Sequence, residues 1–529
     1  MREPTSRFAT EPEYRFKHIL IREVAYDMML RPARQDRHAA VTRFLERVTR
    51  ERAGEWASVL AYHWGQAGNR EKELTNLLLA AGVAGRSWAK GEAVALYTQA
   101  LDLLAGNDPR RGSVRLSRAL AFADMSDYRA AVAELDALIP VLEPRLRLEA
   151  LVARGWASQW VSDPEGLRVH ATEAVELAGS LGDRDLEGPA LALLALAHSS
   201  EGDNLTSLKV AERAVAIWRP GVRTGDLTNY IEFTGLTNYW LGGYKRSEDL
   251  VRQAYEIGRD VHSVRGVLSA VPTMGLALAG QGRMEEALRV FAEVIASPPE
   301  VEQPSLWFSR ALNMWAGVLR ELQDFDEARR LNEEGIDLAA QAAFAMGHCH
   351  GGIDLLYIAL ATGDVGAAEK AWPRLWEEAN ASTMVHRWVM SGRLLTAKAQ
   401  IELALGRVAE ASDAAVRSIQ EHRARGRRRH ELMSRLALGS ALLQLGRRSA
   451  GLAQLREALA AAERIGHAPS IWRAAYALGR AIASTDDKAA QAAHARAQAA
   501  VQGLAASLSP ERRARFLASP TIAEVLKGP

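Results

Sequence analysis

Three adjacent side chains of metal-binding type, His348, Cys349 and His350, stand in the run GHCHGG. Imidazole nitrogens and thiolate sulfurs are common ligands of Zn²⁺. Successive residues of a helix point about 100° apart, however, so three neighbours cannot converge on one ion while the helix persists. The sequence therefore predicts no metal site here. It predicts instead that Gly351 and Gly352 allow a close helix approach or a kink, and that both histidines face solvent or a groove.

The run HRARGRRRH, from His422 to His430, is the densest cluster of positive charge in the chain. Nucleic-acid sites usually combine such charge with aromatic side chains that stack on bases, and the run contains no Phe, Tyr or Trp. Arginine-rich segments of this kind are usually solvated. We therefore expect the run to be a solvated junction between two helical repeats.

Motifs for catalysis are absent. No G-x-x-x-x-G-K-[ST] run occurs, so no lysine and hydroxyl pair is present to hold phosphates and Mg²⁺. No carboxylate pair of a nucleotide cyclase and no Ser-His-Asp or Cys-His order stands out. We expect a protein that is not an enzyme, with no catalytic residues, no cofactor and no metal.

Composition favours one long helical array. The 529 residues are rich in Ala, Leu, Arg and Glu, with no Pro/Gly/Ser-rich linker, and 66 basic residues against 64 acidic ones leave a formal net charge of +2. No global field therefore attracts nucleic acid or an anionic membrane. A single cysteine, an apolar run no longer than LALLALA and the lack of a signal-peptide core predict a cytoplasmic protein without membrane attachment.

Short turns recur along the chain at a nearly constant spacing. Their first positions are Gly202, Gly242, Gly282, Gln323, Gly363, Gly406 and Gly446, which are 40, 40, 41, 40, 43 and 40 residues apart. Seven positions before each turn the residue is small in six of seven cases: Ala195, Gly235, Gly275, Ala316, Leu356, Ala399 and Gly439. Five positions after each turn it is always small: Ser207, Ser247, Ala287, Ala328, Ala368, Ala411 and Gly451. Small side chains at fixed offsets indicate two helices that pack closely across each turn.

This pattern resembles the tetratricopeptide repeat, stretched from its usual length of about 34 residues to about 40. Weaker copies have turns near Ser126, Ser162 and Thr485. We expect ten or eleven helical hairpins between Ala53 and about Ser507. They predict an all-α fold, a right-handed superhelical solenoid of tetratricopeptide-like hairpins.

The opening stretch reads as a short strand, YRF, followed by a helix that Arg31-Pro32 stops and a second helix from about Ala33. Together with LAYHWGQAGNREKELTNLLLAAGVA and LSPERRARFLASPTIAEVL, it resembles the segment after the ATPase in bacterial STAND signalling proteins. Those proteins are linked to class III adenylate/guanylate cyclases or to transcriptional-regulator domains. The resemblance implies a nucleotide-sensing role for His18, but no nucleotide domain stands before it, so we expect His18 to pack or cap.

The resemblance also implies a domain organisation. We expect residues 1–52 to be the remnant of a winged-helix-like module, 53–507 the solenoid and 508–529 a C-terminal tail. Since the ATPase and cyclase motifs are missing, we expect the chain to be a C-terminal segment: a separately encoded solenoid, a split gene or a truncated relic.

In a tetratricopeptide-like hairpin the first helix lines the concave face. Positions thirteen, ten and six before each turn share one stripe of that helix. In five central repeats they are Asn229, Glu232, Leu236, Ser269, Pro272, Leu276, Arg310, Asn313, Gly317, His350, Ile353, Tyr357, Arg393, Thr396 and Gln400. Arg310, His350 and Arg393 recur at one offset and predict a ladder of donors for an acidic peptide or an anionic effector. The alternative is that these side chains are solvated and a partner binds elsewhere.

The candidate binding residues are Asn229, Glu232, Arg310, Asn313, His350, Tyr357, Arg393 and Gln400. Most of the thirteen tryptophans are expected in the core, including the i, i+4 pairs Trp156/Trp160 and Trp372/Trp376.

Three hypotheses for function remain open. The first is a non-catalytic module that binds a protein, peptide or small effector and relays this to an ATPase or cyclase module in trans. The second is a structural scaffold without an effector, and the third, least favoured, is a nucleic-acid-binding solenoid. A groove of mixed polar residues favours the first, an apolar convex face the second and a continuous basic stripe the third.

Overall fold

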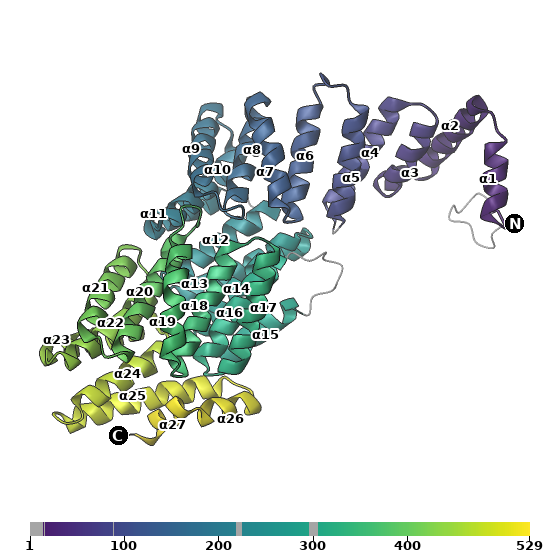
Figure 1. Cartoon of the computed structure of the whole chain (residues 1–529). Coiled ribbons are helices and arrows are strands. Elements are labelled where there is room, and N and C mark those ends of the chain that lie inside the picture. Colours follow the sequence, from purple (N-terminus) through teal and green to yellow (C-terminus); the bar gives the residue numbers. More distant parts are fainter. Residues whose placement is uncertain (1–13, 15, 88, 218–224, 296–304, 529) are drawn as a thin grey trace. The chain divides into compact units, whose positions relative to one another are not determined.

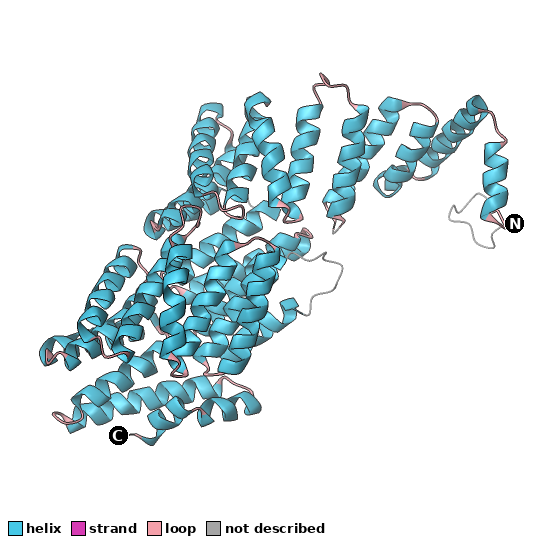
Figure 2. Cartoon of the chain, viewed as in Figure 1, coloured by secondary structure: helices cyan, strands magenta, loops and turns pink. Residues whose placement is uncertain are grey.

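A computed structural model describes residues 14, 16–87, 89–217, 225–295 and 305–528, which form helices joined by turns and loops (Figures 1 and 2). The described residues form no strand, and Tyr14 alone has the conformation of a β-bridge residue. The chain consists of two compact units, residues 1–146 and residues 147–529. The predicted all-α solenoid of helical hairpins is confirmed. No helix of the described part is long and apolar enough to cross a membrane.

Unit 1 contains the first seven helices. They are α1 (Ile19–Asp27), α2 (Arg31–Val48), α3 (Ala53–Gln66), α4 (Arg70–Gly85), α5 (Lys90–Leu103), α6 (Arg111–Asp124) and α7 (Tyr128–Leu138), with 3₁₀ turns at Arg50–Arg52 and Ile139–Val141.

Unit 2 begins inside α8 and contains the remaining helices. They are α8 (Pro144–Ser158), α9 (Pro164–Leu181), α10 (Arg184–Glu201), α11 (Asn204–Ile217), α12 (Gly225–Trp240), α13 (Tyr244–Asp260), α14 (Val264–Gly280), α15 (Met284–Ile295), α16 (Ser305–Glu321), α17 (Phe325–Gln341), α18 (Ala345–Ala361), α19 (Val365–Ala379), α20 (Arg387–Ala404), α21 (Val408–Ala424), α22 (Arg428–Gln444), α23 (Arg448–Ile465), α24 (Ala468–Ile482), α25 (Asp487–Ala506), α26 (Pro510–Ala518) and α27 (Pro520–Lys527).

The start of unit 1 differs from the expectation in two places. Phe16 lies in a loop and Arg15 lies outside the described residues, so the predicted strand YRF finds no support. Arg31-Pro32 begins α2 instead of ending the helix before it, because proline in the first helical turn loses no intrahelical hydrogen bond. The domain bounds at residues 52 and 507 stay predictions.

The predicted hairpin register matches the geometry of unit 2. All seven predicted turn positions have positive φ, from 62° at Gln323 to 92° at Gly202. The small residues before and after a turn face each other: the Ser207 hydroxyl donates to the Ala195 carbonyl oxygen over 2.7 Å. In another hairpin, a Cβ added at Gly439 would lie 3.2 Å from the carbonyl oxygen of Gly451. The small side chains are therefore needed because the two backbones nearly touch.

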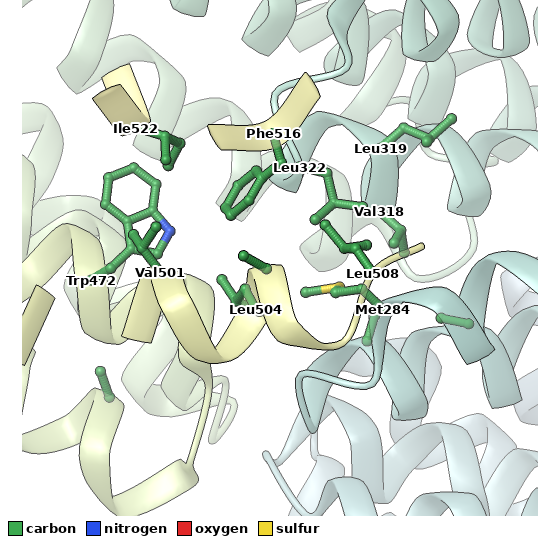
Figure 3. Close-up of a cluster of buried hydrophobic side chains, with 14 of the residues drawn as sticks. Met284, Val318, Leu319, Leu322, Trp472, Val501, Leu504, Leu508, Phe516 and Ile522 are labelled. Atoms are coloured by element: carbon green, nitrogen blue, oxygen red, sulfur yellow. The ribbon is translucent and has the colours of Figure 1, made fainter. Parts of the chain in front are cut away.

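The C-terminal helices of unit 2 join the core of the earlier hairpins. Figure 3 shows Leu504 and Phe516 beside Met284 and Leu322, which come from the middle of the chain. Ile522 and Val525 of α27 are fully buried in the same cluster. The backbone N–H of Ser509 donates to the Glu285 carboxylate over 3.1 Å. Residues 508–528 therefore pack into the core of unit 2.

Later hairpins of unit 2 also return to its first ones. The Trp388 indole N–H donates to the Ser199 carbonyl oxygen over 2.6 Å across 189 residues of sequence. The turn before α22 contacts the turn after α12, where a Cβ added at Gly426 would lie 2.6 Å from Leu241 Cδ2. Gly426 also has a φ of 67°. Glycine is therefore favoured at this position both by the close approach and by the left-handed backbone conformation. These contacts close unit 2 around its centre.

Candidate functional site

A central cavity of about 220 Å³ lies inside unit 2. Its walls are mainly the first helices of successive hairpins, α12, α14, α16, α18, α20 and α22, with contributions from α8 and the start of α24. All eight candidate binding residues line it. Of the fifteen stripe positions, Pro272 and Ile353 do not, and Ile353 is fully buried in an apolar cluster. The structure thus brings the candidate residues together, while their role in binding stays a prediction.

Arg310 of α16 is held by an acidic residue from α12. Its guanidinium lies 3.2 Å from a Glu232 carboxylate oxygen and donates to the Thr273 hydroxyl over 3.2 Å. The Thr273 hydroxyl in turn donates to Glu232 over 2.5 Å. Both charged side chains are about nine-tenths buried. Arg310 is therefore a neutralised member of the cavity wall.

Arg393 of α20 is paired in the same way with Asp354 of α18. The two are 2.5 Å apart, and Arg320 lies 3.4 Å from the same carboxylate oxygen. Burial alone would raise the pKa of Asp354, but the two arginines outweigh burial and lower it. Burial, reinforced by Arg393, lowers the pKa of His350 to about 3, so this histidine is neutral near pH 7. The two arginines of the predicted ladder are therefore paired within the wall and its histidine is uncharged, while the binding role of the ladder stays a prediction.

A second carboxylate, Glu321 at the end of α16, collects arginines from distant hairpins. Arg473 lies 2.6 Å and Arg429 lies 3.2 Å from its oxygens. Arg429 also donates to the Tyr239 hydroxyl over 2.6 Å. Burial opposes ionisation of Glu321, but the surrounding arginines lower its pKa well below the usual range. Glu321 therefore ties α12, α22 and α24 to α16 at one end of the cavity.

Arg427, just before α22, differs from the other arginines of the cavity. Its side chain is 1% exposed, and no carboxylate of the described residues forms an ion pair with it. Its guanidinium donates to the Val389 carbonyl oxygen over 3.2 Å and to His430 Nε2 over 3.1 Å, while its Nε has no partner. Burial, reinforced by Arg393, lowers the pKa of Arg427 to about 9, so the group stays charged at pH 7. A buried positive charge without a counter-charge is costly unless something supplies one.

The basic run from His422 to His430 is therefore not the solvated junction that the sequence predicted. His422 and Arg427 are buried, and Arg427, Arg429 and His430 line the cavity. The run lies inside because later hairpins close onto earlier ones, a contact that no local pattern reveals. Arg423 and Arg428 of the same run are exposed.

Aromatic side chains cover much of the remaining wall. The ring of Trp160 lies 4.7 Å from that of Trp307, and Trp240 lies 5.2 Å from Trp388. Trp156 and Trp160 line the cavity, and Trp156 also packs against a buried apolar cluster, as expected for a core residue. Trp372 and Trp376 stack at 5.2 Å beside an apolar cluster, as expected for ridge residues.

The GHCHGG run and His18 were also candidates from the sequence, as a metal site and as a nucleotide sensor respectively. His348 hydrogen-bonds Glu378 at 2.6 Å, Cys349 is buried, and no group of three metal-ligating side chains occurs in the described part of the chain. Added Cβ atoms would lie 2.7 Å from Ile336 at Gly351 and 2.6 Å from Leu375 at Gly352, so the predicted close approach of helices at these glycines is confirmed. His18 is exposed at the N-cap of α1 and makes no capping hydrogen bond through its side chain.

Several cavity residues were missed from the sequence: Arg320, Glu321, Asp354, Arg427 and Arg429. Asp354 carried a usable signal, because it is the one acidic residue of the apolar run GGIDLLYIAL and a lone charge on a buried helix needs a partner. Arg427 and Arg429 carried no such signal, because the run from His422 to His430 contains exposed arginines as well as buried ones.

Comparison with known proteins gives no family for this chain. No family model matches it, and no curated protein matches it. Among solved structures it is similar to a Rap protein complexed with competence and sporulation factor, with 14% identity and a TM-score of 0.47 over 74% of this chain and 99% of that one. It is also similar to the APC/C hetero-tetramer Cut9–Hcn1, with 13% identity and a TM-score of 0.44 over 93% of each chain.

A third similar structure is a signal transduction ATPase with numerous domains from Pyrococcus horikoshii that has a tetratricopeptide repeat sensor. Identity is 12% and the TM-score 0.43, over 68% of this chain and 56% of that one. Similarity at this level assigns no ligand or partner. The chain's own geometry defines an all-α solenoid of tetratricopeptide-like hairpins with a central cavity in its second unit.

Proposed function

We propose that the chain is a non-catalytic sensor module whose unit 2 binds an effector in the central cavity. One observation supports the proposal. Helices of successive hairpins line a single cavity with polar and aromatic side chains, although these helices are spread over more than 300 residues of sequence. Ligand sites are typically concave and largely apolar, with a few polar groups that fix orientation. A scaffold without an effector has no need for such a cavity. The polar lining of the cavity therefore favours an effector-binding module over a structural scaffold.

Closure of unit 2 supplies a route by which occupancy is relayed. The cavity wall is shared by α12 and α16 on one side and α22 and α24 on the other, joined through Glu321, Arg429 and Arg473. A ligand that touches both sides stabilises the closed arrangement relative to an opened one. We propose that a protein partner binds the closed and the opened arrangement of unit 2 with different affinity. We propose that this partner is an ATPase or cyclase module in trans, in a bacterial signalling system.

The binding step is tested with anilinonaphthalene sulfonate, an aromatic anion, in a calorimetric titration of the full chain. We expect one molecule to bind per chain. Leu276 is half-buried and lines the cavity, so Leu276→Trp should fill it and weaken binding at least tenfold. The matched control is Leu205→Trp in α11, because Leu205 is 60% exposed. Equal affinity in both variants, or no saturable binding to the unmodified chain, would refute the proposed function.

A further inference from the structure

We propose, building on the proposed function, that the effector is an aromatic acid whose anionic group pairs with Arg427 while its ring lies against the aromatic and methionine side chains beside it. The proposal assigns to Arg427 and His430 the role of anchor residues. The sequence predicted an acidic peptide or an anionic effector, and an aromatic acid is a narrower class of ligand.

The charges of the cavity wall do not balance. Five arginines line it, Arg310, Arg320, Arg393, Arg427 and Arg429, against three carboxylates, Glu232, Asp354 and Glu321. The three carboxylates are engaged by arginines other than Arg427. Four histidines line the cavity, and burial lowers the pKa of each: to about 3 for His350, to about 4 for His386, and well below the usual value for His430 and His467, so none adds charge near pH 7. The wall therefore carries an excess of two positive charges, which an anionic ligand would offset.

Hydrogen-bond donors without partners lie at Arg427. Because arginine only donates, His430 Nε2 must accept from it, and the neutral imidazole then carries its hydrogen on Nδ1. Nδ1 of His430 and Nε of Arg427 are both buried and without a hydrogen-bond partner. Buried donors are almost always satisfied in native proteins, so two unsatisfied ones on side chains that contact each other point to an acceptor supplied by a ligand. A carboxylate accepts from both kinds of donor.

The surroundings of these donors are apolar and aromatic. The Arg427 guanidinium lies 5.2 Å from the centre of the Trp388 ring, and Trp388 packs edge-on against Trp240. Trp240, Val389, Met390 and Met433 line the cavity. Methionine side chains adapt to a ligand's shape and contact aromatic rings favourably. The cavity that Arg427 lines therefore offers apolar and aromatic side chains suited to a flat ring.

The test compares indoleacetate with its neutral analogue indoleacetamide by calorimetric titration of the full chain. The two differ in charge but hardly in shape. We expect the acid to bind at least tenfold more tightly than the amide, and inorganic phosphate to bind at least tenfold more weakly than the acid. Equal affinity for acid and amide would overturn the assignment of an anion site, and phosphate binding as tight as that of the acid would overturn the role of the ring.

Variants locate the site. Arg427→Met removes the charge and keeps an apolar side chain, so the preference for the acid should vanish, whereas Arg427→Lys should retain part of it. Arg428→Met is the matched control, because Arg428 is its exposed neighbour. If Arg427→Met keeps the full preference, the assignment of Arg427 is wrong. If anilinonaphthalene sulfonate binds in the cavity and neither indole compound does, the aromatic-acid proposal fails while the proposed function stands.

Discussion

Asn204 on α11 donates its side-chain N–H to the carbonyl oxygen of Arg425 over 2.9 Å, although 221 residues separate them in sequence. Asn204 is 1% exposed, and its amide oxygen accepts from the Ser199 hydroxyl at 3.3 Å. A buried amide that joins its own hairpin, α10 and α11, to the end of α21 marks the seam at which unit 2 closes. The seam lies beside the turn before α22, whose Arg427 lines the cavity.

Asn204→Ala should weaken the seam. The substitution leaves the Arg425 carbonyl oxygen without this donor, and an unsatisfied buried group costs about 1–3 kcal/mol. We expect the free energy of unfolding in urea to fall by that amount. Asn380→Ala is the control, since exposed Asn380 bonds only to its own helix. Equal losses in the two variants would contradict a stabilising role for the seam.

Ala368→Leu should overpack its hairpin. Ala368 is fully buried at the close-approach position after the Gly363 turn, and extra methyl groups in a packed core cost about 1–3 kcal/mol. Because the units of a solenoid are held by neighbouring interfaces, hydrogen exchange should rise first in α18 and α19. Ala367→Leu, one residue earlier and exposed, should leave both measurements nearly unchanged. Indistinguishable thermal melts would show that the register is wrong.

Asp354→Asn should destabilise unit 2 strongly. The substitution leaves Arg393 and Arg320 buried without their carboxylate, and breaking one partner of a buried ion pair costs about 3–5 kcal/mol. The measurement is urea-induced unfolding, with Asp413→Asn on the exposed face of α21 as control. For the same reason, replacing Arg310 and Arg393 together should lower the melting temperature. A variant as stable as the control would contradict the pairing.

The free energy of unfolding should decrease as the pH falls, before the buried carboxylates of Asp354 and Glu321 are protonated. The pKa of His350 is lowered to about 3, so between pH 6.5 and that value the unfolded chain binds a proton that the folded chain excludes. The free energy of unfolding therefore decreases as pH falls from 6.5 to 5, by about 1–2 kcal/mol for this histidine. The stability contributed by Asp354 and Glu321, whose pKa values are lowered, is lost only at lower pH.

His350→Gln should remove part of this dependence. We expect a flatter curve of unfolding free energy against pH between pH 6.5 and 5, measured by urea titrations at several pH values. An unchanged slope in the variant would show that His350 is not buried as a neutral group.

The sequence predicted the hairpins well because their determinants are local. A glycine with positive φ at the turn and small residues on either side, such as Ala195 and Ser207, are readable at fixed offsets. The same register placed the eight candidate residues on one cavity wall. Superhelical closure could not be read in this way, because it depends on small rotations added over many hairpins. Arg427 was therefore taken as solvated, and the pairing of Arg393 with Asp354 was missed.

A crystal structure of the full chain grown with indoleacetate tests the central claim most directly. We predict the ligand in the central cavity of unit 2, with a carboxylate oxygen within hydrogen-bond distance of Arg427 and the ring beside Trp240. A ligand bound elsewhere on the chain while the cavity holds only solvent, or a ligand in the cavity with its carboxylate turned away from Arg427, would contradict the account.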